Sequence, residues 1–159
     1  MAELKDVIAY LLKNYPEHMR GELSNARVTK MIYLADWHSC LRGKGQITGI
    51  NWYFDNYGPF VWDIAKTAEE NADIFEMVET TNAYGGRKKL LRLRDKGYEP
   101  DLTKSEKKSV DHIIEVASKL FWKDFIKLVY STHPIASSER YEFLDLSELA
   151  EEYKLVREV

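Results

Sequence analysis

The sequence predicts an α+β, mainly α-helical fold, with a single domain of about five to six helices and a small antiparallel β-sheet or hairpin. Apolar residues recur at helical spacing in several segments, and two capping-box patterns mark where helices begin. Two β-capable segments flank a glycine-rich turn, which is typical of a hairpin. At 159 residues the chain suits one domain, and no repeat or linker divides residues 1–159.

Two helices are expected before residue 42. The first stops before Pro16 and has its apolar residues at the i, i+3, i+4, i+7 and i+8 positions, namely Leu4, Val7, Ile8, Leu11 and Leu12. Ser24 can cap the second, over residues 25–41, whose apolar positions cover so broad a face that we expect a central helix. The RGKG segment at residues 42–45 then ends this helix through glycine.

The middle of the chain should contain short strands and one helix. Residues 46–57 are rich in β-branched and aromatic side chains and predict one or two strands. We expect Tyr57-Gly58-Pro59 to turn the strand into a helix, with Gly58 permitting the bend and Pro59 at the first helical position. Residues 74–80 and 87–94 flank a TNAYGG turn and predict the antiparallel hairpin.

Two capping boxes predict the helices of the C-terminal part. The first, at Thr103 and Glu106, precedes a helix whose apolar stripe is Val110, Ile113, Ile114, Ala117, Leu120 and Phe121. Residues 122–132 predict another helix that ends at His133, which Pro134 biases toward extended geometry. The second box, at Asp145 and Glu148, precedes a terminal helix.

Composition excludes several classes of protein. The longest apolar run is well short of the roughly 20 residues that span a bilayer, and the N-terminus lacks the features of a signal peptide. A single cysteine agrees with a cytoplasmic location, which we expect. A formal charge of −3 argues against a dedicated DNA-binding protein, although residues 86–96 carry six basic residues and one acid.

No catalytic or metal-binding pattern stands out, and we expect no cofactor. The four histidines lack the i, i+4 spacing of helical zinc pairs, and no glycine loop suits a phosphate. His133 either caps carbonyls at a helix end or acts in catalysis or partner contact. Asp36 is either a hydrogen-bonded acid or a base or partner contact, while Cys40 is expected to be buried and inert.

The stretch ITGINWYFDNYGPFVW, residues 47–62, concentrates aromatic side chains around one turn. Its expected core residues are Ile47, Ile50, Phe54 and Val61. Alternation along a strand means that Trp52 and Tyr53 cannot both face inward, so at least one aromatic side chain should be exposed. If that side chain lies beside Trp62, we expect the two to form a binding surface.

The segment from Val28 to Pro59 resembles the Panacea antitoxin domain, also called SocA-like or phage-associated GepA-like. Its matching positions are Lys30, Tyr33, Ala35, Asp36, Ile47, Thr48, Gly49, Tyr57, Gly58 and Pro59. A weaker match reaches Thr132-His133, but Pro134-Ile135 follows where family members carry a Pro-Trp pair. The resemblance implies a mainly helical domain that binds and neutralises a toxin encoded by a neighbouring gene, without enzymatic activity.

Three hypotheses follow from the sequence. The first is a toxin-binding antitoxin, which leaves homo-oligomerisation open and whose candidate contact residues are Tyr33, Asp36, Arg42, Tyr53, Asp55, Tyr57, Trp62 and His133. The second is a nucleic-acid-binding regulator that uses the basic residues between Arg87 and Arg94, with affinity that falls steeply as salt is raised. The third is a hydrolase or transferase centred on His133 with Asp36 or Asp63.

Overall fold

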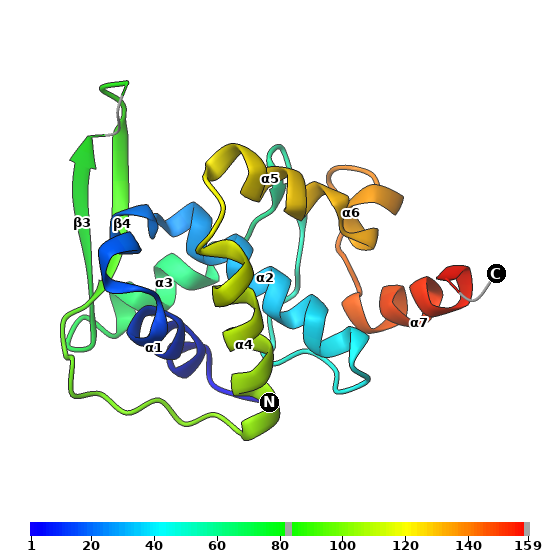
Figure 1. Ribbon diagram of the computed structural model, residues 1–159, viewed down its shortest axis with the longest axis horizontal. Coiled ribbons are helices and arrows are strands. Elements are labelled where there is room, and N and C mark those ends of the chain that lie inside the picture. Colours follow the sequence, from blue (N-terminus) through cyan, green and yellow to red (C-terminus); the bar gives the residue numbers. More distant parts are fainter. Residues whose placement is uncertain (82–83, 158–159) are drawn as a thin grey trace.

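The computed structural model describes residues 1–81 and 84–157 (Figure 1). Over these residues it contains seven α-helices, one 3₁₀ helix and two sheets of two antiparallel strands each. In chain order the elements are α1 (Leu4–Asn14), η1 (Glu17–Glu22), α2 (Asn25–Leu41), β1 (Phe54–Asp55), β2 (Gly58–Pro59), α3 (Asp63–Glu70), β3 (Phe75–Thr81), β4 (Arg87–Leu93), α4 (Lys104–Ala117), α5 (Trp122–Ser131), α6 (His133–Ser137) and α7 (Leu146–Arg157). The mainly helical α+β class is confirmed, and η1 and the short α6 add to the five to six helices expected.

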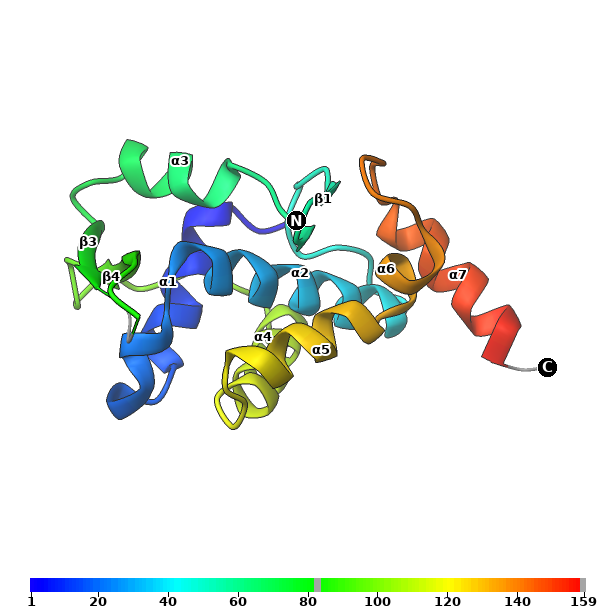
Figure 2. The same ribbon diagram turned by 90° about the horizontal axis from the view of Figure 1, so that it is seen from above.

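Helix α2 is the centre of the fold. It crosses the middle of Figure 2, with α3 and β1 on one side and α4 and α5 on the other. Thirteen of its residues, from Arg27 to Cys40, are buried, so the helix is covered on nearly all sides as its broad apolar face predicts. Ser24 caps its start by accepting a hydrogen bond from the amide of Arg27, and Gly43 follows its end with φ of 75°.

The predicted hairpin forms and projects from one end of the molecule (Figure 1). Strands β3 and β4 pair from Phe75 opposite Leu93 to Thr81 opposite Arg87. The Leu91 amide donates to the Leu23 carbonyl at 2.9 Å, which ties β4 to the segment before α2. Two residues of the expected turn, 82 and 83, lie outside the described residues.

The helix expected to begin at Pro59 begins at Asp63 instead. Gly58 and Pro59 form β2, which pairs with Phe54 and Asp55, and the Phe60 amide extends the pairing by donating to the Tyr53 carbonyl at 3.0 Å. At Pro59, where we expected a helix to begin, the chain is therefore still part of a strand pair. Gly58 does make the bend, with φ of 100°, a conformation that glycine adopts without strain.

Two expectations in the C-terminal part are also corrected. His133 is the first residue of α6 rather than extended, because Thr132 takes the extended geometry and Pro134 occupies the second helical position. Phe121 does not continue the apolar stripe of α4, which ends at Ala117, and its side chain is 77% exposed. Both capping positions are confirmed, since Thr103 accepts from the Glu106 amide and Asp145 accepts from the Glu148 amide.

Candidate functional site: an aromatic hollow

The aromatic stretch lines a shallow hollow of about 440 Å³ on the protein surface. We call it the aromatic hollow; its lining residues are Gly49, Asn51, Tyr53, Asp55, Phe60, Val61, Trp62, Asp63 and Phe143. Its volume lies within the range of roughly 300–1,000 Å³ in which proteins bind small ligands or side chains of partners. It brings together three of the eight expected contact residues, namely Tyr53, Asp55 and Trp62.

One wall of the aromatic hollow depends on a pairing between distant parts of the chain. The amides of Phe54 and Leu144 donate to the carbonyls of Glu142 and Trp52, at 2.9 and 2.8 Å. This extended pairing turns Trp52 inward, where it is fully buried, and leaves Tyr53 half-buried on the outer side. Tyr53 meets Phe143 edge to face at 5.1 Å between ring centroids.

The other wall consists of Phe60 and Trp62, whose rings meet edge to face at 5.1 Å. Trp62 is 74% exposed and Phe143 is 73% exposed, although side chains of this size are usually more buried. Tyr57 does not line the aromatic hollow, but it is 81% exposed on the neighbouring turn between β1 and β2. The prediction that Trp52 and Tyr53 do not both face inward is confirmed, and Trp62, which the sequence left open between core and surface, is exposed.

The aromatic hollow carries negative charge. Asp55 is half-buried in its wall, and Asp63, the first residue of α3, is exposed at its rim. Behind the wall lies Lys30, which is only 3% exposed and donates to the Pro59 carbonyl at 3.4 Å, with its ammonium 5.8 Å from the Phe60 ring centroid. Burial lowers the pKa of Lys30 to about 8, although the charge of Asp55 acts in the opposite direction.

This buried lysine predicts a pH-dependent stability. Its folded pKa lies below the ordinary 10.5, so the unfolded chain binds more protons between pH 8 and 10.5, and stability should rise with pH across that window. We expect Lys30→Met to remove this rise and to increase the free energy of unfolding near pH 7 by roughly 2–3 kcal/mol. Urea denaturation of both proteins at pH 7 and pH 10 measures the difference, and equal pH dependence in both would contradict the prediction.

Asp36 is a hydrogen-bonded acid of the core, which is one of the two roles that the sequence left open, and it is too buried to serve as a contact residue in this conformation. Its carboxylate accepts hydrogen bonds from the amides of Ile47 and Thr48 at 2.8 and 3.0 Å, from the Thr48 hydroxyl, and from the Trp52 indole at 2.8 Å. Burial raises its pKa to about 6, while the four donors lower it. These bonds join α2 to the start of the aromatic stretch.

Tyr33 is likewise fully buried and cannot contact a partner in this conformation. Its ring meets Trp52 edge to face at 5.5 Å, and its hydroxyl forms a hydrogen bond with the Thr132 hydroxyl at 2.8 Å. Burial raises the pKa of Tyr33 well above its ordinary value. Tyr33 therefore holds the aromatic stretch and the end of α5 against α2.

Arg42 and His133 lie away from the aromatic hollow. Arg42 donates to the Ser105 carbonyl and the Ser109 hydroxyl, both at 3.1 Å, and so joins the end of α2 to α4. The His133 ring lies beside those of Trp37 and Tyr153, at centroid distances of 6.4 and 5.2 Å, and its Nε2 is 3.6 Å from a Glu152 oxygen. It packs α6 against α7 and does not cap helix carbonyls among the described hydrogen bonds.

The other residues considered for catalysis or metal binding do not form a common site. Cys40 is buried, as predicted, and burial raises the pKa of its thiol to about 11. His38 stacks on His112 at 4.4 Å, and its pKa is lowered to about 4, first by burial and then by the neighbouring His112. Within residues 1–81 and 84–157, no group of three His, Cys, Asp or Glu side chains could hold a metal ion.

A family model described as antitoxin SocA-like, Panacea domain, matches residues 28–134, which is about two thirds of the chain. The chain belongs to the SocA-like Panacea domain family. No curated protein and no solved structure gave a significant match. In the described part of the chain, none of the helices is both long and apolar enough to cross a membrane.

The structure explains what the Panacea signature does. Most of the positions that carry the resemblance are buried, including Lys30, Asp36 and Thr48. Tyr57 and Gly49 are the exposed exceptions. The signature of this Panacea domain thus specifies the frame that supports the aromatic hollow, and the exposed aromatic side chains lie on that frame.

Phe143 is the residue of the aromatic hollow that sequence analysis missed. It follows Glu142 in the acidic C-terminal region, outside the matched residues of the Panacea domain. A single phenylalanine in a polar segment carries no local pattern that would assign it to a surface formed by residues 53–63. Only the backbone pairing with Trp52 and Phe54 brings it there.

Proposed function

We propose that this protein is an antitoxin that neutralises a cognate toxin, encoded by a neighbouring gene, through direct protein–protein binding and without a catalytic step. The aromatic hollow is the observation that supports this proposal most strongly. It displays two large aromatic side chains, Trp62 and Phe143, each about three quarters exposed, on a frame that belongs to an antitoxin family. Tryptophan and tyrosine dominate the binding energy of protein interfaces.

The free energy available from this surface is sufficient for binding. Fully burying one large apolar side chain contributes roughly 1.5–3 kcal/mol. Trp62 and Phe143 are already held by edge-to-face contacts with Phe60 and Tyr53, so little side-chain entropy is lost when a partner covers them. A side chain that protrudes from the toxin would fill the aromatic hollow between them.

The charge of the aromatic hollow indicates which type of toxin side chain would fill it. Asp55 and Asp63 place two carboxylates beside the aromatic rings, and a guanidinium or ammonium group interacts favourably with both. The formal charge of −3 would also speed the approach of a basic toxin. We therefore propose an arginine or lysine of the toxin as the occupant of the aromatic hollow.

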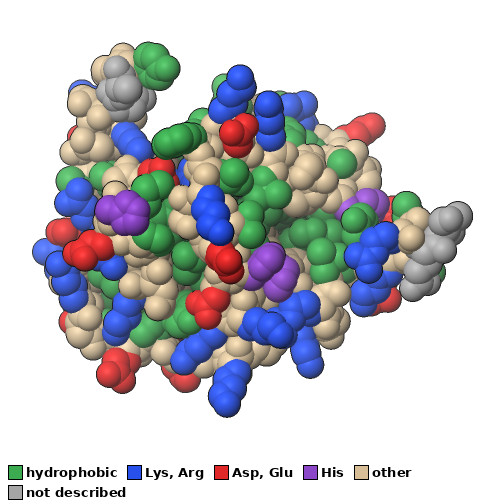
Figure 3. Space-filling view, viewed as in Figure 1, with side chains coloured by type: hydrophobic (Ala, Val, Ile, Leu, Met, Phe, Trp, Pro, Cys, Tyr) green, Lys and Arg blue, Asp and Glu red, His purple; other side chains and the backbone are tan. Residues whose placement is uncertain are grey.

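The two competing hypotheses have less support. In the enzyme hypothesis, Asp36 is already engaged by four donors, and His133 packs against α7 instead of lining the aromatic hollow with Asp63. In the nucleic-acid hypothesis, Lys88 donates to the Gly21 carbonyl and Arg94 pairs with Glu76. Figure 3 also shows one face on which acidic and basic side chains are interspersed and form no basic stripe.

The direct test is co-expression with the product of the neighbouring gene. We expect that gene to arrest growth when expressed alone, and co-expression of the present protein to restore growth. We also expect the two proteins to co-purify and to show binding in calorimetry. Their rate of association, measured separately, should fall as salt is raised. Failure of two folded, purified proteins to form a complex would contradict the proposal.

A further inference from the structure

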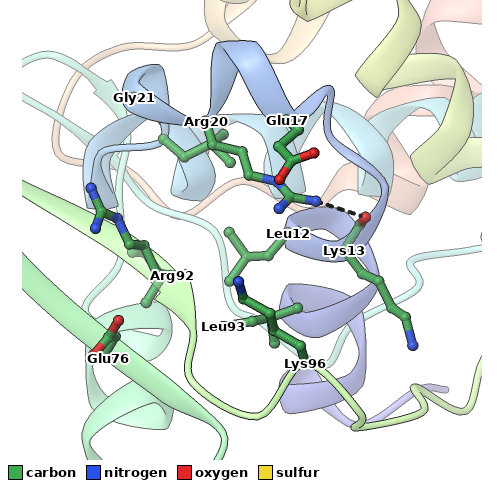
Figure 4. Close-up of a pocket in the computed structure, with 11 residues that line it drawn as sticks. Leu12, Lys13, Glu17, Arg20, Gly21, Glu76, Arg92, Leu93 and Lys96 are labelled. Carbon is green, nitrogen blue, oxygen red and sulfur yellow. Dashed lines mark hydrogen bonds between the residues drawn. The ribbon is translucent and has the colours of Figure 1, made fainter.

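A second hollow lies at the end of the molecule that carries the hairpin, and it shares no residue with the aromatic hollow. Helix α1, the 3₁₀ helix η1 and the hairpin enclose about 530 Å³ (Figure 4). We call it the basic hollow; its lining residues are Leu12, Lys13, Glu17, Arg20, Gly21, Leu23, Glu76, Leu91, Arg92, Leu93 and Lys96. Its size falls within the range of small-molecule sites, which is roughly 300–1,000 Å³.

The floor of the basic hollow is apolar. Leu12, Leu23 and Leu91 are buried beneath it, and Leu93 is half-buried at its side. The hydrogen bond from the Leu91 amide to the Leu23 carbonyl closes the floor between β4 and the end of η1. This surface can receive a flat apolar group such as a heterocyclic ring.

The rim of the basic hollow is positively charged. Four cationic side chains and two carboxylates line it, and one carboxylate, that of Glu76, is 3.8 Å from Arg94 outside the hollow. Lys13 is directed away and donates to the Tyr98 carbonyl at 3.1 Å (Figure 4). Arg20 and Lys96 extend beside the floor, whereas the Arg92 guanidinium is directed outward at the far edge (Figure 4). The second carboxylate, that of Glu17, lies on the Arg20 side of the hollow.

Arg20 carries a buried polar atom that lacks a partner in the described structure. Its terminal Nη2 donates to the Lys13 carbonyl at 3.2 Å, which holds the guanidinium beside the floor. Its Nε is buried without a hydrogen-bond acceptor among the described residues. An orphan donor of this kind costs stability, and because it is buried, a ligand oxygen reaches it only if the Arg20 side chain moves.

We propose that the basic hollow binds a phosphorylated small molecule of nucleotide size, with its phosphates between Arg20 and Lys96, Arg92 at the edge of the site, and its ring on the leucine floor. Guanidinium groups match phosphate oxygens in geometry and charge. A small molecule fits better than a nucleic acid, because these cations line one hollow and do not follow an extended groove. The site lies apart from the toxin-binding surface proposed above, so each can be tested without the other.

The test uses the purified full chain, with ATP, AMP and inorganic phosphate as probes in isothermal calorimetry. We expect saturable one-site binding of the nucleotides, with phosphate weaker because it leaves the leucine floor uncovered. Arg92→Glu and Lys96→Glu change exposed side chains and should each weaken nucleotide binding about tenfold or more. Lys89→Glu makes the same charge change on β4 outside the basic hollow and should alter affinity less than about twofold.

Three results would overturn this proposal. The first is no saturable binding of any of the three probes. The second is an equal loss of affinity in Arg92→Glu and Lys89→Glu, which would indicate attraction by charge alone. The third is tighter binding of a single-stranded oligonucleotide than of ATP, with an affinity that depends on oligonucleotide length, which would assign the surface to nucleic acid.

Discussion

Replacing Asp36 with alanine is expected to lower the free energy of unfolding by about 4 kcal/mol, the largest stability effect that we predict for one substitution. The change leaves the donors of Ile47, Thr48 and Trp52 buried without an acceptor. Each unsatisfied buried donor costs about 1–3 kcal/mol, partly offset by relaxation and entry of water. Because domains are stable by only about 5–15 kcal/mol, much of the margin would be lost.

Asp36→Asn keeps the size of the side chain and removes its charge and one of its two acceptor oxygens. Asparagine keeps one acceptor oxygen, but in either orientation its NH₂ group would face other donors, namely the Ile47 and Thr48 amides or the Trp52 indole and the Thr48 hydroxyl. We therefore expect Asp36→Asn to recover only part of the stability that alanine loses.

Urea denaturation at pH 7 measures both Asp36 variants, with Asp63→Ala as the matched control. Asp63 is an exposed aspartate in the first turn of α3, so its removal should cost less than about 1 kcal/mol. An equal loss in Asp36→Ala and Asp63→Ala would show that the Asp36 network does not stabilise the fold.

Trp62→Ala is expected to weaken binding of the toxin by at least about 2 kcal/mol, or roughly 30-fold, if the proposed function holds. The side chain is 74% exposed in the free protein, so its truncation should leave thermal stability nearly unchanged. Phe143→Ala removes the opposite wall of the aromatic hollow and should have a similar effect. The double variant should be non-additive if one toxin side chain contacts both rings.

Phe121→Ala is the control for these affinity measurements. Phe121 is 77% exposed, as much as the two aromatic side chains under test, and it precedes α5. Phe121 is not among the residues that line the aromatic hollow, and in Figure 2 α5 lies on the other side of α2 from α3. If Phe121→Ala weakened the complex as much as Trp62→Ala, the toxin would not be recognised through the aromatic hollow.

The elements that the structure confirms most closely are those with local sequence signals. The start of α4 follows from a capping box, and the hairpin follows from two β-capable segments and a glycine turn. The predicted helix start was wrong because a local helical preference competes there with strand pairing. Pro59 suits the first position of a helix, but the strand Phe54–Asp55 pairs with it and delays the helix until Asp63.

The candidate site was predicted only in part for the same reason. Alternation along the aromatic stretch correctly indicated that Trp52 and Tyr53 differ in exposure. It could not show that Phe143 would complete the aromatic hollow, about 80 residues further along the chain. The basic hollow was missed because its cations come from α1, η1, β4 and the loop after β4, and no single segment contains the pattern.

The sequence by itself determined the helical class, the central position of α2 and the Panacea family. Each of these depends on a pattern within a short segment, namely apolar periodicity, capping residues or the family signature. The tertiary structure alone decided that Tyr33 and Asp36 are core residues and that Trp62 and Phe143 face solvent together. Burial depends on what packs over a side chain, and here the covering segments come from distant parts of the chain. The residues that specify the fold are consequently different from those that we propose bind the toxin.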